Sequence, residues 1–178
     1  MSAFKAAVAQ YAVSEPASWD IFARTLGEWV AEAAEQGAKL LVFPEYAAMS
    51  LAALFERKVQ IDLSAQLVSM QSLRERYVEL HAQLAERHGV YLLAGSFPWQ
   101  IDVQHYVNRA WFFSPAGERS FQDKQLMTRF EREHWGISAG EPLKAFDTAL
   151  GCIGVAICYD AEFPLLVRAQ VEAGANLL

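Results

Sequence analysis

Short apolar runs alternate along the chain with longer segments in which apolar residues recur at helical spacing. The apolar runs predict strands at Phe4–Tyr11, Leu40–Phe43, Val90–Phe97, Tyr106–Phe113 and Gly151–Ile157, with the start of a further strand at Asn176–Leu178. The segments with helical spacing predict helices at Pro16–Gln36, Ser64–His88 and Glu162–Gly174.

Strands that alternate with helices predict parallel strand pairing and a layered α/β fold whose helices cover the sheet faces. Leu40–Phe43 is apolar throughout, as is typical of a strand buried on both faces. Ser114–Gly117 has the composition of a turn, and Glu118–Asp123 after it is strand-like. Lys124–Pro142 is irregular, charged and aromatic, which predicts a loop. Because no linker or repeat divides the chain, we expect one domain over residues 1–178.

The composition is that of an ordinary globular protein and excludes several classes of partner. Of 178 residues, 53% are hydrophobic and 20% are charged, and the formal net charge of -6 is spread along the chain. No cationic run is available to neutralise phosphates, so we expect no nucleic-acid partner. The apolar runs are too short to span a bilayer, and the N-terminus lacks the pattern of a signal peptide. We therefore expect a cytoplasmic protein without membrane contact.

The chain has 2 cysteines: Cys152 lies in the predicted strand Gly151–Ile157, and Cys158 directly follows that strand. The extended chain between them separates their Cα atoms by about 20 Å, whereas a disulfide needs about 7 Å or less. We expect two free thiols, consistent with a reducing compartment. Since no cluster of His and Cys has the spacing of metal ligands, we expect neither a metal nor a cofactor.

Cys158 has the most informative position, because it lies where a predicted strand runs directly into a predicted helix. The N–H groups and dipole of a helix N-terminus favour a thiolate and also bind an oxyanion. The surroundings of Cys158 therefore fit a catalytic nucleophile, but they fit a buried, inert cysteine equally well. Cys152 lies inside the strand, where we expect a core residue.

Glu45 and Lys124 also lie at the ends of predicted strands. Functional groups in parallel α/β sheets collect at the carboxyl ends of the strands, where a carboxylate is placed to act as a general base. A lysine at the edge of such a site can stabilise a developing oxyanion. Taken alone, however, Glu45 also fits a solvated loop carboxylate, and Lys124 fits an exposed surface charge.

The chain carries three short motifs in order: Phe43-Pro44-Glu45, Asp123-Lys124-Gln125-Leu126, and Cys158-Tyr159-Asp160 with Phe163-Pro164. In order and spacing they resemble the nitrilase superfamily of carbon–nitrogen hydrolases, and the similarity extends from Lys5 to the last residue. The resemblance implies a layered α-β-β-α sandwich with two sheets. Because that fold needs considerably more chain, we expect the C-terminal portion of this domain to be missing here.

The resemblance also implies a Glu–Lys–Cys triad that hydrolyses a small amide or nitrile. Cys158 would attack the substrate carbon to form an acyl-thioester, and Glu45 would move the protons. Lys124 and the backbone N–H of Tyr159 would hold the oxyanion, which makes Tyr159 a substrate-binding residue. We further expect a homo-oligomer that prefers amides to nitriles.

Many members of the superfamily carry a second active-site glutamate in the loop after the lysine. Glu131 and Glu133 are both candidates. We prefer Glu133 as the catalytic one, because its distance to Gly140 matches the family pattern better, and we assign Glu131 to substrate binding. One or both would otherwise belong to a surface charge cluster with Arg129 and Arg132.

Two other functions compete with this interpretation. A papain-like Cys–His enzyme is disfavoured, because the sequence around Cys158 differs from that signature and no histidine follows it. A catalytically inactive binding or assembly module on the same scaffold is the alternative. A binding role, however, would not require all three triad residues.

Overall fold

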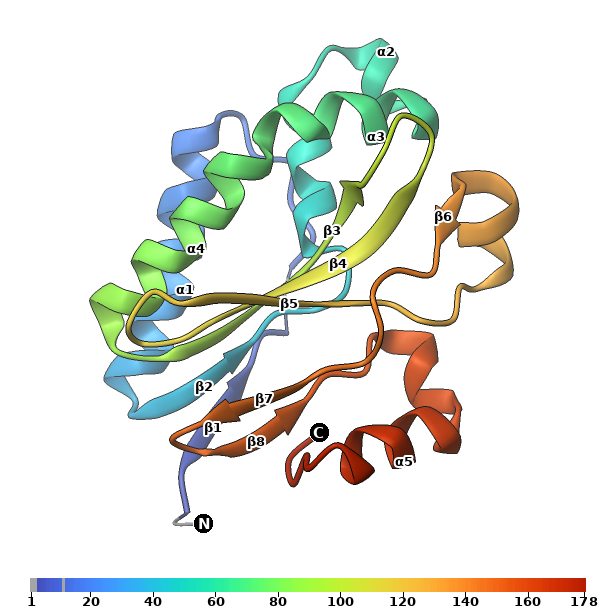
Figure 1. The fold of residues 1–178 in the computed structure, drawn as a ribbon. Coiled ribbons are helices and arrows are strands. Elements are labelled where there is room, and N and C mark those ends of the chain that lie inside the picture. The colour runs from blue at the N-terminus through green and yellow to red at the C-terminus, as the bar shows by residue number, and fades with distance from the viewer. Residues whose placement is uncertain (1–2, 11) are drawn as a thin grey trace.

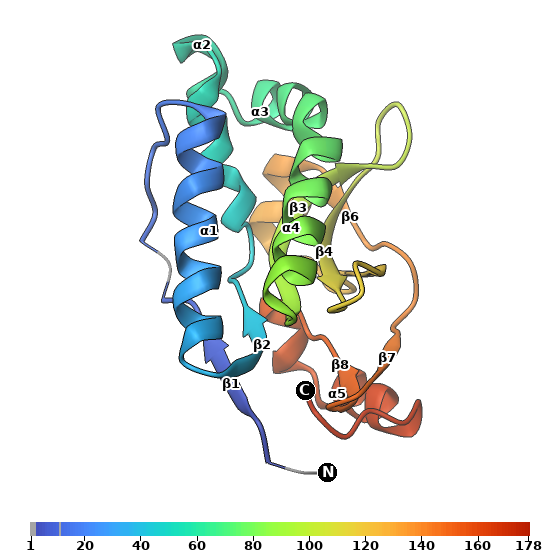
Figure 2. The same ribbon diagram turned by 90° about the vertical axis from the view of Figure 1, so that its left-hand side faces the viewer.

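The structure, a computed structural model, describes residues 3–10 and 12–178. Its strands form two sheets with helices on their outer faces (Figure 1, Figure 2). The larger sheet contains, in spatial order, β1 (Lys5–Val8), β2 (Ala38–Val42), β3 (Tyr91–Gln100), β4 (Tyr106–Phe113) and β5 (Arg119–Asp123), and β6 (Ile137–Ser138) pairs with β4. The smaller sheet contains β7 (Ala145–Thr148) and β8 (Gly151–Gly154).

The direction of strand pairing follows the length of the connections. β1, β2 and β3 run parallel, as predicted, because helical segments connect them. β3 and β4, and likewise β4 and β5, are antiparallel and joined by short loops. The predicted turn Ser114–Gly117 joins β4 to β5, and the N–H of Gly117 donates to the backbone oxygen of Ser114 at 3.0 Å.

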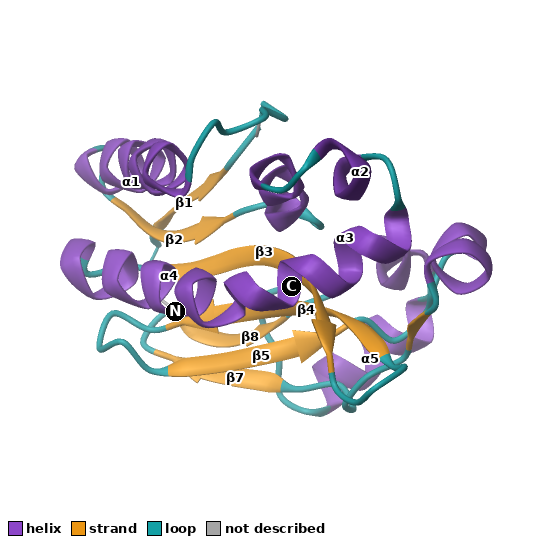
Figure 3. Cartoon of the chain, turned by 90° about the horizontal axis from the view of Figure 1, so that it is seen from above, coloured by secondary structure: helices purple, strands orange, loops and turns teal. Residues whose placement is uncertain are grey.

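Two long helices, α1 (Trp19–Glu35) and α4 (Arg74–His88), cover one face of the larger sheet (Figure 3). α1 starts slightly later than predicted because Ser18 caps it, its hydroxyl accepting the N–H of Ile21 at 3.2 Å. Gly89 ends α4 in the left-handed conformation, at a φ of 62°. The main core fills the space between these helices and the sheet, and its largest buried side chains include Phe22, Met70, Tyr77, Leu92, Phe97 and Phe113.

The single helix predicted over Ser64–His88 is instead two helices, α3 (Leu63–Met70) and α4, with a tight 3-10 turn between them. The side chain of Gln71 in this turn donates to the backbone oxygen of Pro98 at 2.8 Å and accepts the N–H of Gln100 at 3.0 Å. These bonds to the end of β3 set the break. Apolar spacing alone does not reveal the break, because the buried positions of α3, such as Met70, and those of α4, such as Tyr77 and His81, follow one another at helical spacing.

The smaller sheet packs on the larger one, and α5 (Pro164–Glu172) covers its outer side (Figure 1). Gly154 on β8 permits the close approach of α5, since a Cβ there would lie 3.1 Å from the side chain of Gln170. A second apolar core lies between the two sheets and consists of Leu40, Ala110, Phe112, Phe146, Ile153, Val155 and Ile157. The order of layers is therefore helix, sheet, sheet, helix, which confirms the predicted α-β-β-α sandwich.

Two predicted strands are shorter in the structure. The strand predicted over Phe4–Tyr11 is β1, and Tyr11 lies outside the described residues. The strand predicted over Gly151–Ile157 ends as β8 at Gly154, while the following residues are buried by the second core. The predicted further strand at the end of the chain is represented by one parallel bridge between Ile153 and Leu177.

The predicted loop Lys124–Pro142 contains regular structure, namely a π-helix at Glu131–Trp135 followed by β6. Further elements that were not predicted are a 3-10 helix at Ala47–Leu54, α2 (Arg57–Gln60), β7 and a 3-10 helix at Cys158–Glu162. Across residues 3–10 and 12–178, no helix combines the length and apolar character that a membrane span requires.

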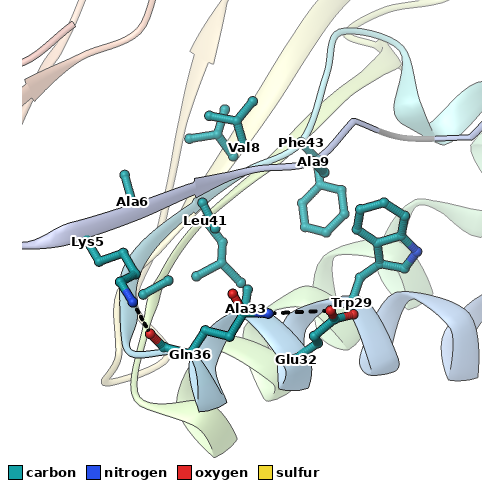
Figure 4. Close-up of a pocket in the computed structure, with 13 residues that line it drawn as sticks. Lys5, Ala6, Val8, Ala9, Trp29, Glu32, Ala33, Gln36, Leu41 and Phe43 are labelled. Carbon is teal, nitrogen blue, oxygen red and sulfur yellow. Dashed lines mark hydrogen bonds between the residues drawn. The ribbon is translucent and has the colours of Figure 1, made fainter.

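β1 forms one edge of the larger sheet, and a groove of about 320 Å³ runs between it and α1 (Figure 4). The ammonium of Lys5 donates to the backbone oxygen of Gln36 across this groove. None of the three predicted triad residues lines it, so the candidate active site lies elsewhere.

Candidate active site

Glu45 lies just beyond the end of β2, and the adjacent part of β3 holds it there. The N–H of Phe43 donates to the backbone oxygen of Leu93 at 2.9 Å, which keeps the two strands together up to this point. Gly95 permits the close approach: its φ is 73°, and a Cβ there would lie 2.3 Å from the backbone oxygen of Pro44. The close packing of the two backbones therefore fixes the position from which the Glu45 side chain extends.

Lys124 follows β5, and its backbone N–H donates to the oxygen of Asn108 on β4 at 2.9 Å. Its side chain is fully buried, with Nζ 2.7 Å from a carboxylate oxygen of Glu45 and 2.7 Å from one of Glu131. Burial acts to lower the pKa of this ammonium, but the hydrogen bonds to Glu131 and Glu45 outweigh it, so the pKa is raised. Lys124 is thus a cation at neutral pH, held between two carboxylates.

Asn108 joins the same two carboxylates, and sequence reasoning missed it. Its side-chain nitrogen donates to Glu45 at 2.8 Å and to Glu131 at 3.3 Å, and the residue is fully buried. An amide can hold both carboxylates without adding a charge. The signal that could have found Asn108 is a small polar residue within the apolar run of β4, where burial requires a hydrogen-bond partner.

Glu131 is almost completely buried and makes more contacts than the ion pair with Lys124. It accepts hydrogen bonds from the hydroxyl of Tyr46 at 2.8 Å and from the N–H and hydroxyl of Thr128 at 2.9 and 2.8 Å. Burial acts to raise the pKa of Glu131, but these bonds, with Lys124 foremost, hold it below its ordinary value. Burial and the charge of Glu131 raise the pKa of Tyr46, which therefore stays a donor.

Glu133, the residue preferred from the sequence, points away from this cluster. Its side chain is 38% exposed and pairs with Arg129 at 2.7 Å and with Arg132 at 3.7 Å. Both glutamates lie in the π-helix Glu131–Trp135, whose winding turns Glu131 inward and Glu133 outward. The structure thus brings Glu131, and not Glu133, to Lys124, which reverses the order expected from the sequence.

Cys158 lies beside Glu45, at the start of a short 3-10 helix (Cys158–Glu162) rather than at the start of α5. The residue is exposed, and its φ of 50° is in the left-handed region that non-glycine residues rarely adopt. Desolvation, followed by a hydrogen bond to Glu45 and the charge of that carboxylate, raises the pKa of the thiol, while Lys124 acts in the opposite direction. The thiol is therefore protonated at neutral pH and has a base beside it.

The backbone N–H of Tyr159 acts to lower the pKa of the Cys158 thiol, as a donor near the sulfur does. The Tyr159 ring is partly exposed and packs edge to face against Phe163, with the ring centroids 5.0 Å apart. A groove of about 600 Å³ opens beside Glu45 and Tyr46. In the described part of the chain, no group of three or more His, Cys, Asp or Glu residues is arranged to hold a metal ion.

Known proteins are similar to almost the whole chain. It is 33% identical over 171 residues to the probable hydrolase YhcX of Bacillus subtilis (strain 168), covering 96% of this chain and 33% of that protein. A carbon–nitrogen hydrolase from Helicobacter pylori G27 superposes with a TM-score of 0.76 at 19% identity, covering 95% of this chain and 56% of the other. A cysteine-to-alanine mutant of the amidase from Nesterenkonia sp. AN1, in complex with butyramide, superposes with a TM-score of 0.63 at 23% identity, covering 91% and 59%.

The chain thus spans a third of the first relative and somewhat more than half of each solved chain. The sequence pattern of the family described as carbon-nitrogen hydrolase matches residues 5–178. With the sequence pattern matched and the fold shared, the chain belongs to the carbon–nitrogen hydrolase family of the nitrilase superfamily.

Proposed function

We propose that this protein hydrolyses the carbon–nitrogen bond of a small-molecule amide through an acyl-thioester on Cys158. The observation that carries the proposal is the position of Glu45 between two groups: its carboxylate is near enough to the Cys158 thiol to raise the thiol pKa, and it lies 2.7 Å from Lys124 Nζ. A thiol, a base beside it and a cation fixed next to the base are the groups that acyl transfer requires.

The first half of the reaction forms the thioester. Glu45 takes the proton of the Cys158 thiol as the sulfur attacks the amide carbon, and the carbonyl oxygen becomes an oxyanion. The Lys124 ammonium and the N–H of Tyr159 stabilise this oxyanion. Glu45 then gives its proton to the amide nitrogen, the carbon–nitrogen bond breaks, and ammonia or an amine leaves.

The second half regenerates the enzyme. Glu45, again a carboxylate, takes a proton from a water molecule whose oxygen attacks the thioester carbon. The same two donors hold the second oxyanion. When the carbon–sulfur bond breaks, the acid leaves and the proton on Glu45 returns to the Cys158 sulfur.

We assign Glu131 the role of second glutamate, in place of Glu133. Its contacts with Lys124 and Tyr46 support a role in fixing the cation rather than in moving protons, since its pKa lies below the ordinary value. An ionised Glu131 holds Lys124 Nζ at 2.7 Å, so that the ammonium is already oriented when the oxyanion forms.

Glu131→Gln is expected to lower kcat by about 10- to 100-fold, because a hydrogen bond to a charged group is worth about 1.5–3 kcal/mol. Glu133→Gln is the matched control, and its exposed ion pairs should leave kcat within about twofold. Steady-state kinetics on the two purified variants measures this. A larger loss in Glu133→Gln than in Glu131→Gln would restore the assignment made from the sequence.

Amides are expected to be preferred to nitriles. A structurally similar protein is an amidase that was solved with butyramide bound, which supports an amide as the substrate class for this chain. Ammonia release from a matched panel of primary amides and the corresponding nitriles, with butyramide in the first set, tests this prediction. Conversion of a nitrile to its acid, without activity on any amide, would contradict it.

An inactive binding or assembly module is not favoured, since such a module would not need a base and a buried cation beside its cysteine. A cytoplasmic homo-oligomer stays the prediction made from the sequence. The free thiols of Cys152 and Cys158 agree with a reducing compartment.

A further inference from the structure

Asp160 is a buried carboxylate in the turn that begins at Cys158, and it takes no part in the reaction proposed above. One of its oxygens accepts the backbone N–H of Leu126 at 2.8 Å. The other accepts the N–H of Ile157 at 3.4 Å, and the N–H of Gln125 lies 3.2 Å from both. A single side chain thus accepts hydrogen bonds from three backbone donors.

These donors belong to two separate segments of the chain. Gln125 and Leu126 directly follow Lys124, whereas Ile157 directly precedes Cys158. Asp160 therefore links the segment that carries the cation to the segment that carries the thiol. The Lys124 segment follows β5 of the larger sheet and the Cys158 segment follows β8 of the smaller one, so Asp160 connects the two sheets at the site.

Cys158 itself needs such support, because its φ of 50° is unfavourable for a residue with a Cβ. Asp160 closes the turn from both sides. Its own N–H donates to the backbone oxygen of Ile157 at 3.1 Å, while its carboxylate accepts the Ile157 N–H. Two hydrogen bonds between Asp160 and Ile157, one from the backbone N–H of Asp160 and one to its side chain, thus span Cys158 and hold its conformation.

We infer that Asp160 is a positioning residue that fixes the Cys158 sulfur and the Lys124 ammonium relative to each other. It does not contact the substrate. The inference rests on the proposed function, because the two groups that it aligns are the nucleophile and the oxyanion donor of that reaction.

The variants Asp160→Ala and Asp160→Asn test this inference. The first leaves the three backbone donors without an acceptor, and a displacement of about 1 Å at a reacting centre can lower the rate by about 100-fold. Asp160→Asn keeps one oxygen for Leu126 but turns an N–H group toward another donor, so we expect a smaller loss. In both variants kcat per folded molecule should fall, while KM changes by less than about threefold, because positioning acts on the transition state.

Two control variants separate positioning from general stability. Glu162→Gln removes an exposed carboxylate from the same turn. Asp62→Asn alters a carboxylate that also accepts a backbone N–H, that of Ala65 at 2.8 Å, at the start of α3. Both controls should retain kcat. Thermal unfolding of every variant provides the folded fraction to which the rates are normalised.

The outcomes distinguish this inference from the proposed function. If the wild-type protein shows no amidase activity and iodoacetamide modifies Cys158 no faster than Cys152, the proposed function fails. If the wild-type protein is active and folded Asp160→Asn and Asp160→Ala both retain its kcat, the inference about Asp160 is overturned. Failure of both variants to fold would assign Asp160 to folding alone and would overturn it as well.

Discussion

Replacing Cys158 with alanine is expected to abolish amide hydrolysis, whereas Cys152→Ala should retain most of it. Without the sulfur no thioester forms, and the oxyanion donors alone cannot supply a nucleophile. Because the Cys158 residue is exposed, its truncation to alanine should leave the core intact. Ammonia release from a primary amide measures both variants.

Cys152 is a suitable control because it lies on β8, away from Glu45 and Lys124. It faces Asp147 of β7 in the strand ladder. Desolvation, then a hydrogen bond to Asp147, raises the pKa of this thiol, and no cation counteracts the shift among the causes that act on it. Equal losses in the two alanine variants would mean that the nucleophile is misassigned.

Lys124→Met is expected to lower kcat by about 100- to 1000-fold, the usual effect of losing one oxyanion donor. The side chain keeps nearly the same length, so the change removes the charge and the donors while preserving most of the packing. The substitution also leaves Glu45 and Glu131 without the cation between them. Breaking a buried ion pair in this way costs about 3–5 kcal/mol, so stability must be measured together with the rate.

The matched control is Lys144→Met, which removes a lysine that pairs with Glu141 at 2.8 Å on the surface. This variant should retain both activity and thermal stability. Glu45→Gln completes the set, since an amide cannot accept the thiol proton, and kcat should again be largely lost. A folded Lys124→Met protein with near-normal turnover would contradict the role of Lys124.

The sequence predicts the position of the site better than its inner arrangement. Glu45, Lys124 and Cys158 could be located because each lies at the end of a predicted strand and because their three motifs together resemble the nitrilase superfamily. Glu131 and Glu133 could not be separated in the same way. Which of them faces inward depends on the winding of a π-helix that carries no apolar periodicity of its own.

Apolar pattern reports burial and not the reason for it, which explains the other differences. Val155 and Ile157 are as deeply buried as residues of a core strand, which is why the sequence predicted a strand there. They follow the end of β8, however, and are buried by the core between the two sheets. Cys158 starts a short 3-10 helix rather than α5. Desolvation and the carboxylate of Glu45, which an apolar pattern does not report, raise the pKa of its thiol. Asn108 escaped notice because its role depends on two carboxylates that are distant in the sequence.

The most direct test of the central claim is to locate the acyl group on the enzyme during turnover. The substrate should be an amide whose turnover is accelerated by added hydroxylamine. Such acceleration shows that hydrolysis of the thioester limits the rate, so the acyl-enzyme accumulates when hydroxylamine is left out. After an acid quench, mass spectrometry of the tryptic peptide 145–168, which contains both cysteines, identifies the modified residue. We predict the mass of the acyl group on Cys158, whereas an acyl group on Cys152, or an unmodified Cys158 under these conditions, would contradict the account.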